Sequence, residues 1–177
     1  MMTLDSRYLE AFPGWLRSLA DDAQKLAGLL EQKAAPGAQR GAASALTYLF
    51  KSLDLIPDGL EDLGFIDDAF VLRVAAAQVA ESERDAGGAL ARLAGDAELI
   101  REFLGPDYAR LERYVEKLSE GSARGRSVAQ ILEDATLRSD FVREVKQWAS
   151  GYAAPSFARD TRSLIKLKSF LGTRLPA

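Results

Sequence analysis

The chain has 177 residues, of which 47% are hydrophobic and 28% are charged, and its formal net charge is −3. That length fits one domain, and the composition is too apolar for a disordered chain. Because the sequence contains neither cysteine nor histidine, it excludes disulfides, thiolate metal sites, cysteine nucleophiles and histidine-dependent triads. The negative net charge disfavours a nucleic-acid partner.

Apolar residues recur at helical spacing along nearly the whole chain, and glycine or proline separates the helical segments. The segments predicted as helices are, in chain order, residues 4–11, 13–35, 38–53, 67–83, 89–104, 106–118, 128–149 with a candidate break at Arg138–Ser139, and 160–171. We therefore expect an all-α fold, a single bundle of about seven to eight helices. The helix over 38–53 has few charges and is expected to be central.

The glycine-containing loop at 121–125 is the best candidate for a boundary within the chain. We expect a helical domain over residues 1–120 and a C-terminal helical extension over residues 121–177, packed on the same core. Ser127 is followed three residues later by Gln130, which is a capping-box pattern and predicts a helix start directly after Ser127.

One segment, LDLIPDGLEDLGFIDDAFVL at residues 53–72, combines six acids with regularly spaced apolar residues and contains no base. The residues that define its pattern are Asp54, Pro57, Asp58, Gly64, Asp67 and Asp68. D-L-I-P-D, then a glycine, then D-D at a helix start resembles the YkvA-like family, the domain of unknown function 1232. The resemblance covers about residues 41–80 and implies a helix–turn–helix hairpin with no established activity.

The residues of this motif support a structural reading. Asp67 is placed to cap the helix that follows, and Asp68 adds negative charge near the positive end of that helix. Pro57 fixes the backbone in the turn, and Asp54 or Asp58 could accept hydrogen bonds from free amides there. The motif would then be a rigid corner that joins two core helices.

Two functional readings stay open beside the corner. Asp58, Asp67 and Asp68 could converge on a divalent cation such as Mg²⁺ or Ca²⁺, since hard cations prefer oxygen ligands. The EF-hand pattern is not met, and such a site would serve a hydrolase or a sensor. Alternatively, exposed acids of the motif could dock a basic peptide. No other cofactor is expected.

The C-terminal segment is basic, with five bases and one acid over residues 155–177. As a helix it places its leucines on one side, and its candidate contact residues are Arg159, Arg162, Lys166 and Lys168. Such a helix can pack its apolar side on an acidic body, dock a partner, or lie on an anionic membrane.

These observations favour a non-enzymatic interaction or scaffold module with a protein partner. A carboxylate–metal hydrolase or sensor and peripheral membrane association through the basic helix are the alternatives. The charged residues near the start, Asp5, Arg7 and Glu10, do not fit a signal peptide, and no uncharged run is long enough for a membrane span, so we expect neither. The expected location is the cytoplasm, with possible contact at the inner membrane.

Overall fold

The computed structural model describes residues 4–32, 34–51, 55–56, 63–82 and 88–177. In this part of the chain the fold is all-α, with eight α-helices, one 3₁₀ helix and one two-stranded hairpin, which confirms the expected class. The elements are α1 (Leu4–Glu31), α2 (Pro36–Leu49), α3 (Ile66–Ser82), α4 (Gly88–Leu104), α5 (Asp107–Lys117), η1 (Leu118–Glu120), β1 (Ser122–Ala123), β2 (Arg126–Ser127), α6 (Val128–Glu133), α7 (Ala135–Gly151) and α8 (Thr161–Arg174).

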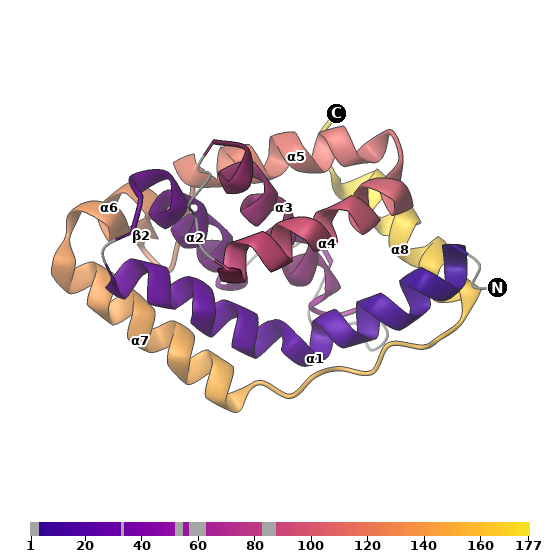
Figure 1. Ribbon diagram of the computed structural model, residues 1–177, viewed down its shortest axis with the longest axis horizontal. Coiled ribbons are helices and arrows are strands. Elements are labelled where there is room, and N and C mark those ends of the chain that lie inside the picture. The colour runs from indigo at the N-terminus through magenta and orange to yellow at the C-terminus, as the bar shows by residue number, and fades with distance from the viewer. Residues whose placement is uncertain (1–3, 33, 52–54, 57–62, 83–87) are drawn as a thin grey trace.

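The helix α3 lies at the centre of the bundle, with α1, α2, α4 and α5 packed around it (Figure 1). Residues 66–76 of α3 are buried without exception, and residues 42–49 of α2 are buried as well. Residues 42–49 carry no charge, which follows from this position, because a helix without a broad face toward water has little need of charged residues. Residues 66–76 of α3 are enclosed as well but contain the charged residues Asp67, Asp68 and Arg73. The sequence therefore predicts correctly that the helix over residues 38–53, which is α2, is internal. However, α3 is the more enclosed of the two helices.

The first two predicted helices are one helix, because α1 runs through Pro13 without ending. A proline inside a helix costs about 3 kcal/mol, since it removes one backbone hydrogen bond and crowds the preceding turn. The residues on both sides of Pro13 offset this cost. Tyr8, Phe12 and Leu16 are buried in the same core, so both halves are held against the same neighbours. The prediction of a break at residues 11–13 is wrong for this reason.

The predicted loop at 121–125 contains a hairpin, in which Ser122 pairs with Ser127 and Ala123 with Arg126. Its two central residues, Arg124 and Gly125, both have positive φ angles, of 52° and 76°. Such angles suit a two-residue hairpin turn, where glycine at the second position is unstrained. The capping box that follows is confirmed, since Ser127 and Gln130 exchange side-chain hydrogen bonds with each other's backbone amides.

The predicted helix 128–149 is interrupted at Asp134, four residues before the candidate break at Arg138–Ser139. The Asp134 carboxylate accepts hydrogen bonds from the amides of Thr136 and Leu137. An aspartate that satisfies free amides in this way starts a helix. It therefore ends α6 and begins α7.

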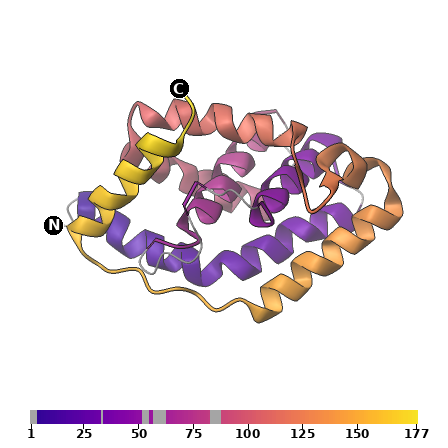
Figure 2. The ribbon, with the colours of Figure 1, turned by 180° about the vertical axis from the view of Figure 1, so that it is seen from behind.

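The segment 152–160 runs as an extended strap alongside α1 and carries the chain from α7 to α8 (Figures 1 and 2). The Tyr152 hydroxyl donates a hydrogen bond of 2.8 Å to the Leu16 carbonyl, and the Phe157 ring meets the Phe12 ring edge-on at 6.2 Å. The C-terminal elements are thus attached to the first helix. The division of the chain at residue 121 stays a prediction.

Candidate functional site

Of the motif, the structure describes residues 55–56 and 63–72, which form the corner between α2 and α3, and the acids among them are buried. Asp67 is 0% exposed and Asp68 is 1% exposed, although both belong to the first turn of a helix. Asp67 does not precede the helix as an N-cap, because α3 begins at Ile66. The prediction of negative charge in the first helical turn is confirmed.

A hydroxyl from α2 connects Asp67 to the chain before the corner. The Tyr48 hydroxyl donates a hydrogen bond of 2.5 Å to Asp67 Oδ2 and accepts one of 2.8 Å from the Leu55 amide. The Ile56 amide donates to the same Asp67 oxygen at 3.3 Å. Residues 55 and 56, the L-I of the motif, are therefore tied to both helices.

Burial raises the pKa of the Tyr48 hydroxyl, and the charges of Asp67 and Asp68 raise it further. The hydroxyl therefore keeps its proton at physiological pH and remains a permanent donor to Asp67. A phenol in this state does not act as a nucleophile or a general base, since a tyrosine must lose its proton for either role.

An aromatic contact holds the residue that precedes α3. Phe65 has a φ angle of 67°, which costs a residue with a side chain about 1–2 kcal/mol. Its ring meets Tyr152 edge-on at 5.4 Å and lies 6.2 Å from Trp148. Gly64, directly before it, is buried. The end of α7 thus supports the corner, and Trp148 is partly buried there while Trp15 lies in the core.

The structure does not describe a complete set of ligands for the predicted metal site. Asp54, Pro57 and Asp58 lie outside the described residues. Among the residues that are described, no group of three or more acids could hold a metal ion. Asp67 and Asp68 adjoin on the same helical turn, and Asp67 Oδ2 already accepts the hydrogen bonds from Tyr48 and Ile56.

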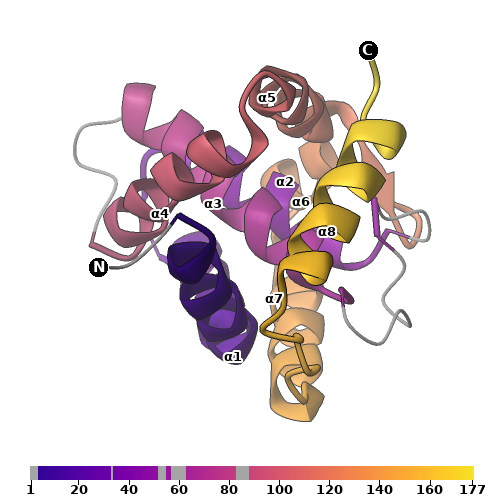
Figure 3. The same ribbon diagram turned by 90° about the vertical axis from the view of Figure 1, so that its right-hand side faces the viewer.

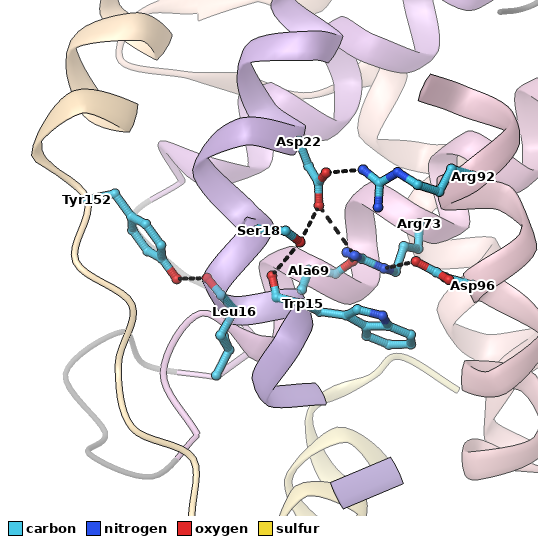
Figure 4. Close-up of polar contacts among 9 residues, drawn as sticks. All are labelled: Trp15, Leu16, Ser18, Asp22, Ala69, Arg73, Arg92, Asp96 and Tyr152. Atoms are coloured by element: carbon cyan, nitrogen blue, oxygen red, sulfur yellow. Dashed lines mark hydrogen bonds and ion pairs between the residues drawn. The ribbon is translucent and has the colours of Figure 1, made fainter. Parts of the chain in front are cut away.

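The sequence analysis missed a buried ion network that joins α1, α3 and α4 (Figure 4). Arg73 of α3 is 0% exposed, and its guanidinium contacts Asp22 at 3.3 Å and Asp96 at 3.1 Å. It lies 4.4 Å from the centre of the Trp15 ring. Arg92 also pairs with Asp22 from the solvent side, and its own side chain is 46% exposed.

The network balances two acids against two bases. Asp22 additionally accepts a hydrogen bond of 2.9 Å from the Ser18 hydroxyl. Burial lowers the pKa of the Arg73 guanidinium, and the charges of Asp22 and Asp96 oppose that lowering. All three guanidinium nitrogens of Arg73 donate hydrogen bonds within this chain, to Asp96, the Ala69 carbonyl and Asp22. Its enclosure makes it a structural group rather than a group that binds substrate.

The sequence does carry a signal for this network. Arg73 is the single charge in the run 69–80, and Asp22 lies among the apolar positions of the stripe that includes Leu19 and Leu26. A lone charge on a buried face needs an opposite charge nearby, because an unpaired buried ion is very costly. Nothing in the sequence indicates which acid that is.

The C-terminal helix α8 lies against the other helices of the bundle (Figure 3). It buries its apolar side and exposes the other. Leu164, Leu167 and Leu171 of α8 are buried, which confirms that the leucines face the body. On the opposite side Ile165 is 64% exposed, and it is the only large hydrophobic residue in the described ranges that is exposed. Arg162 and Lys166 flank Ile165 on this surface and are exposed too.

The four candidate tail residues do not act as one set. Lys168 is held against the body, with its ammonium 4.9 Å from the centre of the Phe103 ring of α4. Arg159 is exposed on the strap, before Asp160 caps α8. Arg162 and Lys166 are one helical turn apart and share the outer face with Ile165. No described helix has the combination of length and apolar character that crossing a membrane requires.

The comparisons with known proteins agree with the motif. The model of a family described as "Protein of unknown function (DUF1232)" matches residues 41–73, which confirms the resemblance over this part of the chain. The matched segment begins at Gly41 on α2 and ends at Arg73, so it contains Tyr48, Asp67 and the corner between them. No curated protein and no solved structure matches the chain.

Proposed function

We propose that this protein is a non-enzymatic interaction module that docks an acidic segment of a partner protein through the outer face of α8. The observation that carries the proposal is the 64% exposure of Ile165 beside two exposed bases, Arg162 and Lys166. An aliphatic anchor with flanking charges suits a protein interface, where the apolar contact supplies affinity and the charges supply orientation and rate.

The choice of α8 over the motif follows from the direction of the charges. The acids of the motif that the structure describes, Asp67 and Asp68, are enclosed and cannot meet a basic peptide while they stay buried. The bases of α8 already face solvent, so they can meet an anionic partner without any rearrangement of the fold.

A protein partner is favoured over a membrane because the leucines of α8 are buried against the rest of the protein. Helices that lie in a bilayer interface insert a broad apolar face. In α8 that face, formed by Leu164, Leu167 and Leu171, is packed against the body. Only Ile165 remains to enter lipid. We include a cytoplasmic location in the proposal, and the absence of cysteine is compatible with it.

The test uses the full chain and a fluorescein-labelled peptide with glutamates on both sides of a leucine. In the variant Arg162→Glu/Lys166→Glu we expect binding, measured by fluorescence anisotropy, to weaken by roughly tenfold or more, because each exposed ion pair is worth up to about 1 kcal/mol. Raising the salt concentration should weaken binding to the unaltered chain, since exposed charges are screened.

The matched control is Arg113→Glu/Lys117→Glu, a pair of exposed bases one turn apart on α5. It changes the net charge by the same amount and should bind the peptide more tightly than the α8 variant does. If both variants lose the same peptide affinity, the loss is due to the change in net charge alone, and the assignment of the binding site to α8 is overturned. Binding to vesicles of anionic phospholipid without binding to the peptide would replace the protein partner by a membrane.

A further inference from the structure

A pocket of about 240 Å³ lies between α2, α3 and α5, on a different part of the molecule from the exposed face of α8. Its walls combine apolar side chains with two opposite charges. The lining residues used below are Arg40, Glu116, Ala75, Val79 and Val115. Ligand pockets for drug-sized molecules usually measure about 300–1,000 Å³, so this pocket suits a smaller molecule.

The two charges come from separate helices, Arg40 from α2 and Glu116 from α5. The ion pairs of the described residues include neither of them, and in particular they do not pair with each other. Arg40 and Glu116 therefore line one pocket without forming an ion pair with each other. A ligand that carries an anion and a cation a few bonds apart would meet both groups at once.

The apolar part of the lining sets what else the ligand carries. Ala75 and Val79 of α3 and Val115 of α5 are buried residues that also line this pocket. These three side chains make the part of the lining beside the two charged residues aliphatic, and an apolar group of a ligand can pack there.

We propose that this pocket binds a small zwitterion with an aliphatic side chain, an α-amino acid such as leucine. The ligand carboxylate pairs with Arg40, its ammonium pairs with Glu116, and its side chain packs on Val79 and Val115. This inference is independent of docking through α8. Binding is weak, in the millimolar range, because both charged groups are exposed and exposed ion pairs are screened by water.

The test compares three probes by NMR titration of the full ¹⁵N-labelled chain. Leucine has both charges, N-acetylleucine lacks the ammonium, and leucinamide lacks the carboxylate. We expect saturable shifts of the Gly41, Val79 and Val115 amides with leucine, and about fivefold weaker binding of each of the other two probes, as expected from the loss of one exposed ion pair.

Two variants assign the charges. Arg40→Gln should bind leucine and leucinamide equally, and Glu116→Gln should bind leucine and N-acetylleucine equally. Glu133→Gln is the matched control, because Glu133 lines a neighbouring hollow next to Arg40 but not this pocket. Leucine shifts that do not saturate, that appear away from these helices, or that persist in the Arg40→Gln/Glu116→Gln double variant would overturn the proposal.

Discussion

A single hydroxyl at Tyr48 holds the corner of the motif, because it donates to Asp67 and accepts from the Leu55 amide. Replacement of Tyr48 by phenylalanine keeps the ring but removes both hydrogen bonds in a buried place. We expect Tyr48→Phe to lower the free energy of unfolding by about 1–3 kcal/mol, as is usual when buried polar groups lose their partner. Urea denaturation followed by circular dichroism measures this loss.

The control for this prediction is Tyr108→Phe. Tyr108 is also buried, and its hydroxyl makes no hydrogen bond to any described residue. Its replacement should change the free energy of unfolding by well under 1 kcal/mol. If both variants lose the same stability, the cost arises from removing a buried hydroxyl in general, and the corner has no special role.

The residues of the motif could be identified from the sequence. Whether their acidic side chains point into the core or toward solvent could not. The alternation of acids with apolar residues is equally consistent with an acidic surface, a metal site and a buried corner. The partner of Asp67 is Tyr48, which lies 19 residues earlier on another helix. Only the packing of α2 against α3 shows that this carboxylate is enclosed rather than offered to a ligand.

At the scale of elements, Gly41 controls how closely α2 approaches α3. A Cβ atom at this position would lie 2.4 Å from Cγ2 of Val79. Alanine normally stabilises a helix by about 0.5–1 kcal/mol relative to glycine, whereas overpacking costs about 1–3 kcal/mol. We therefore expect Gly41→Ala to lower the thermal midpoint of unfolding, measured by calorimetry.

Two further variants separate the clash from helix propensity. Gly95→Ala adds a methyl group in α4 where nothing lies within 4 Å, so it should raise the midpoint. In the background Val79→Ala the obstructing methyl groups are gone, and Gly41→Ala should then stabilise the protein. Destabilisation by Gly41→Ala in that background as well would show that another feature of the site requires glycine.

Helices were easier to predict than the places where they end. The capping box at Ser127 is local chemistry, so the start of α6 follows from four residues of sequence. Pro13 is also a local signal, and there the local rule fails because burial of Phe12 and Leu16 keeps α1 continuous. Asp134 has the chemistry of a cap but lies within a run of good helical spacing, which hid the break.

At the scale of the whole molecule, the network around Arg73 connects helices that are remote in the chain. Arg73 and Asp22 are 51 residues apart, and Arg92 and Asp22 are 70 apart. Helical periodicity describes one helix at a time, so it can show that Arg73 is buried but not which partners neutralise it. Such contacts depend on how α1, α3 and α4 are arranged next to one another in the bundle.

The network around Arg73 predicts that a variant lacking two of its charges is more stable than a variant lacking only the charge of Arg73. Arg73→Met removes one charge and leaves Asp22, which is 0% exposed, with a reduced set of partners. Breaking a buried ion pair from one side costs about 3–5 kcal/mol, whereas replacing both charges by neutral groups can cost much less. We therefore expect the double variant Asp22→Asn/Arg73→Met to be more stable than Arg73→Met alone, in urea denaturation followed by tryptophan fluorescence.

The variant Arg92→Ala shows whether burial is the cause. Arg92 contacts the same carboxylate, but its side chain is 46% exposed, so water can replace it. We expect it to cost about 1 kcal/mol or less. Two results would contradict this explanation: Arg92→Ala lowers the free energy of unfolding as much as Arg73→Met does, or the double variant is the least stable of the set. In either case the ion pair with Arg73 is not what makes burial of the Asp22 carboxylate tolerable. The contact between the guanidinium and the Trp15 ring would then account for the loss, because that contact joins α1 to α3 without using the carboxylate.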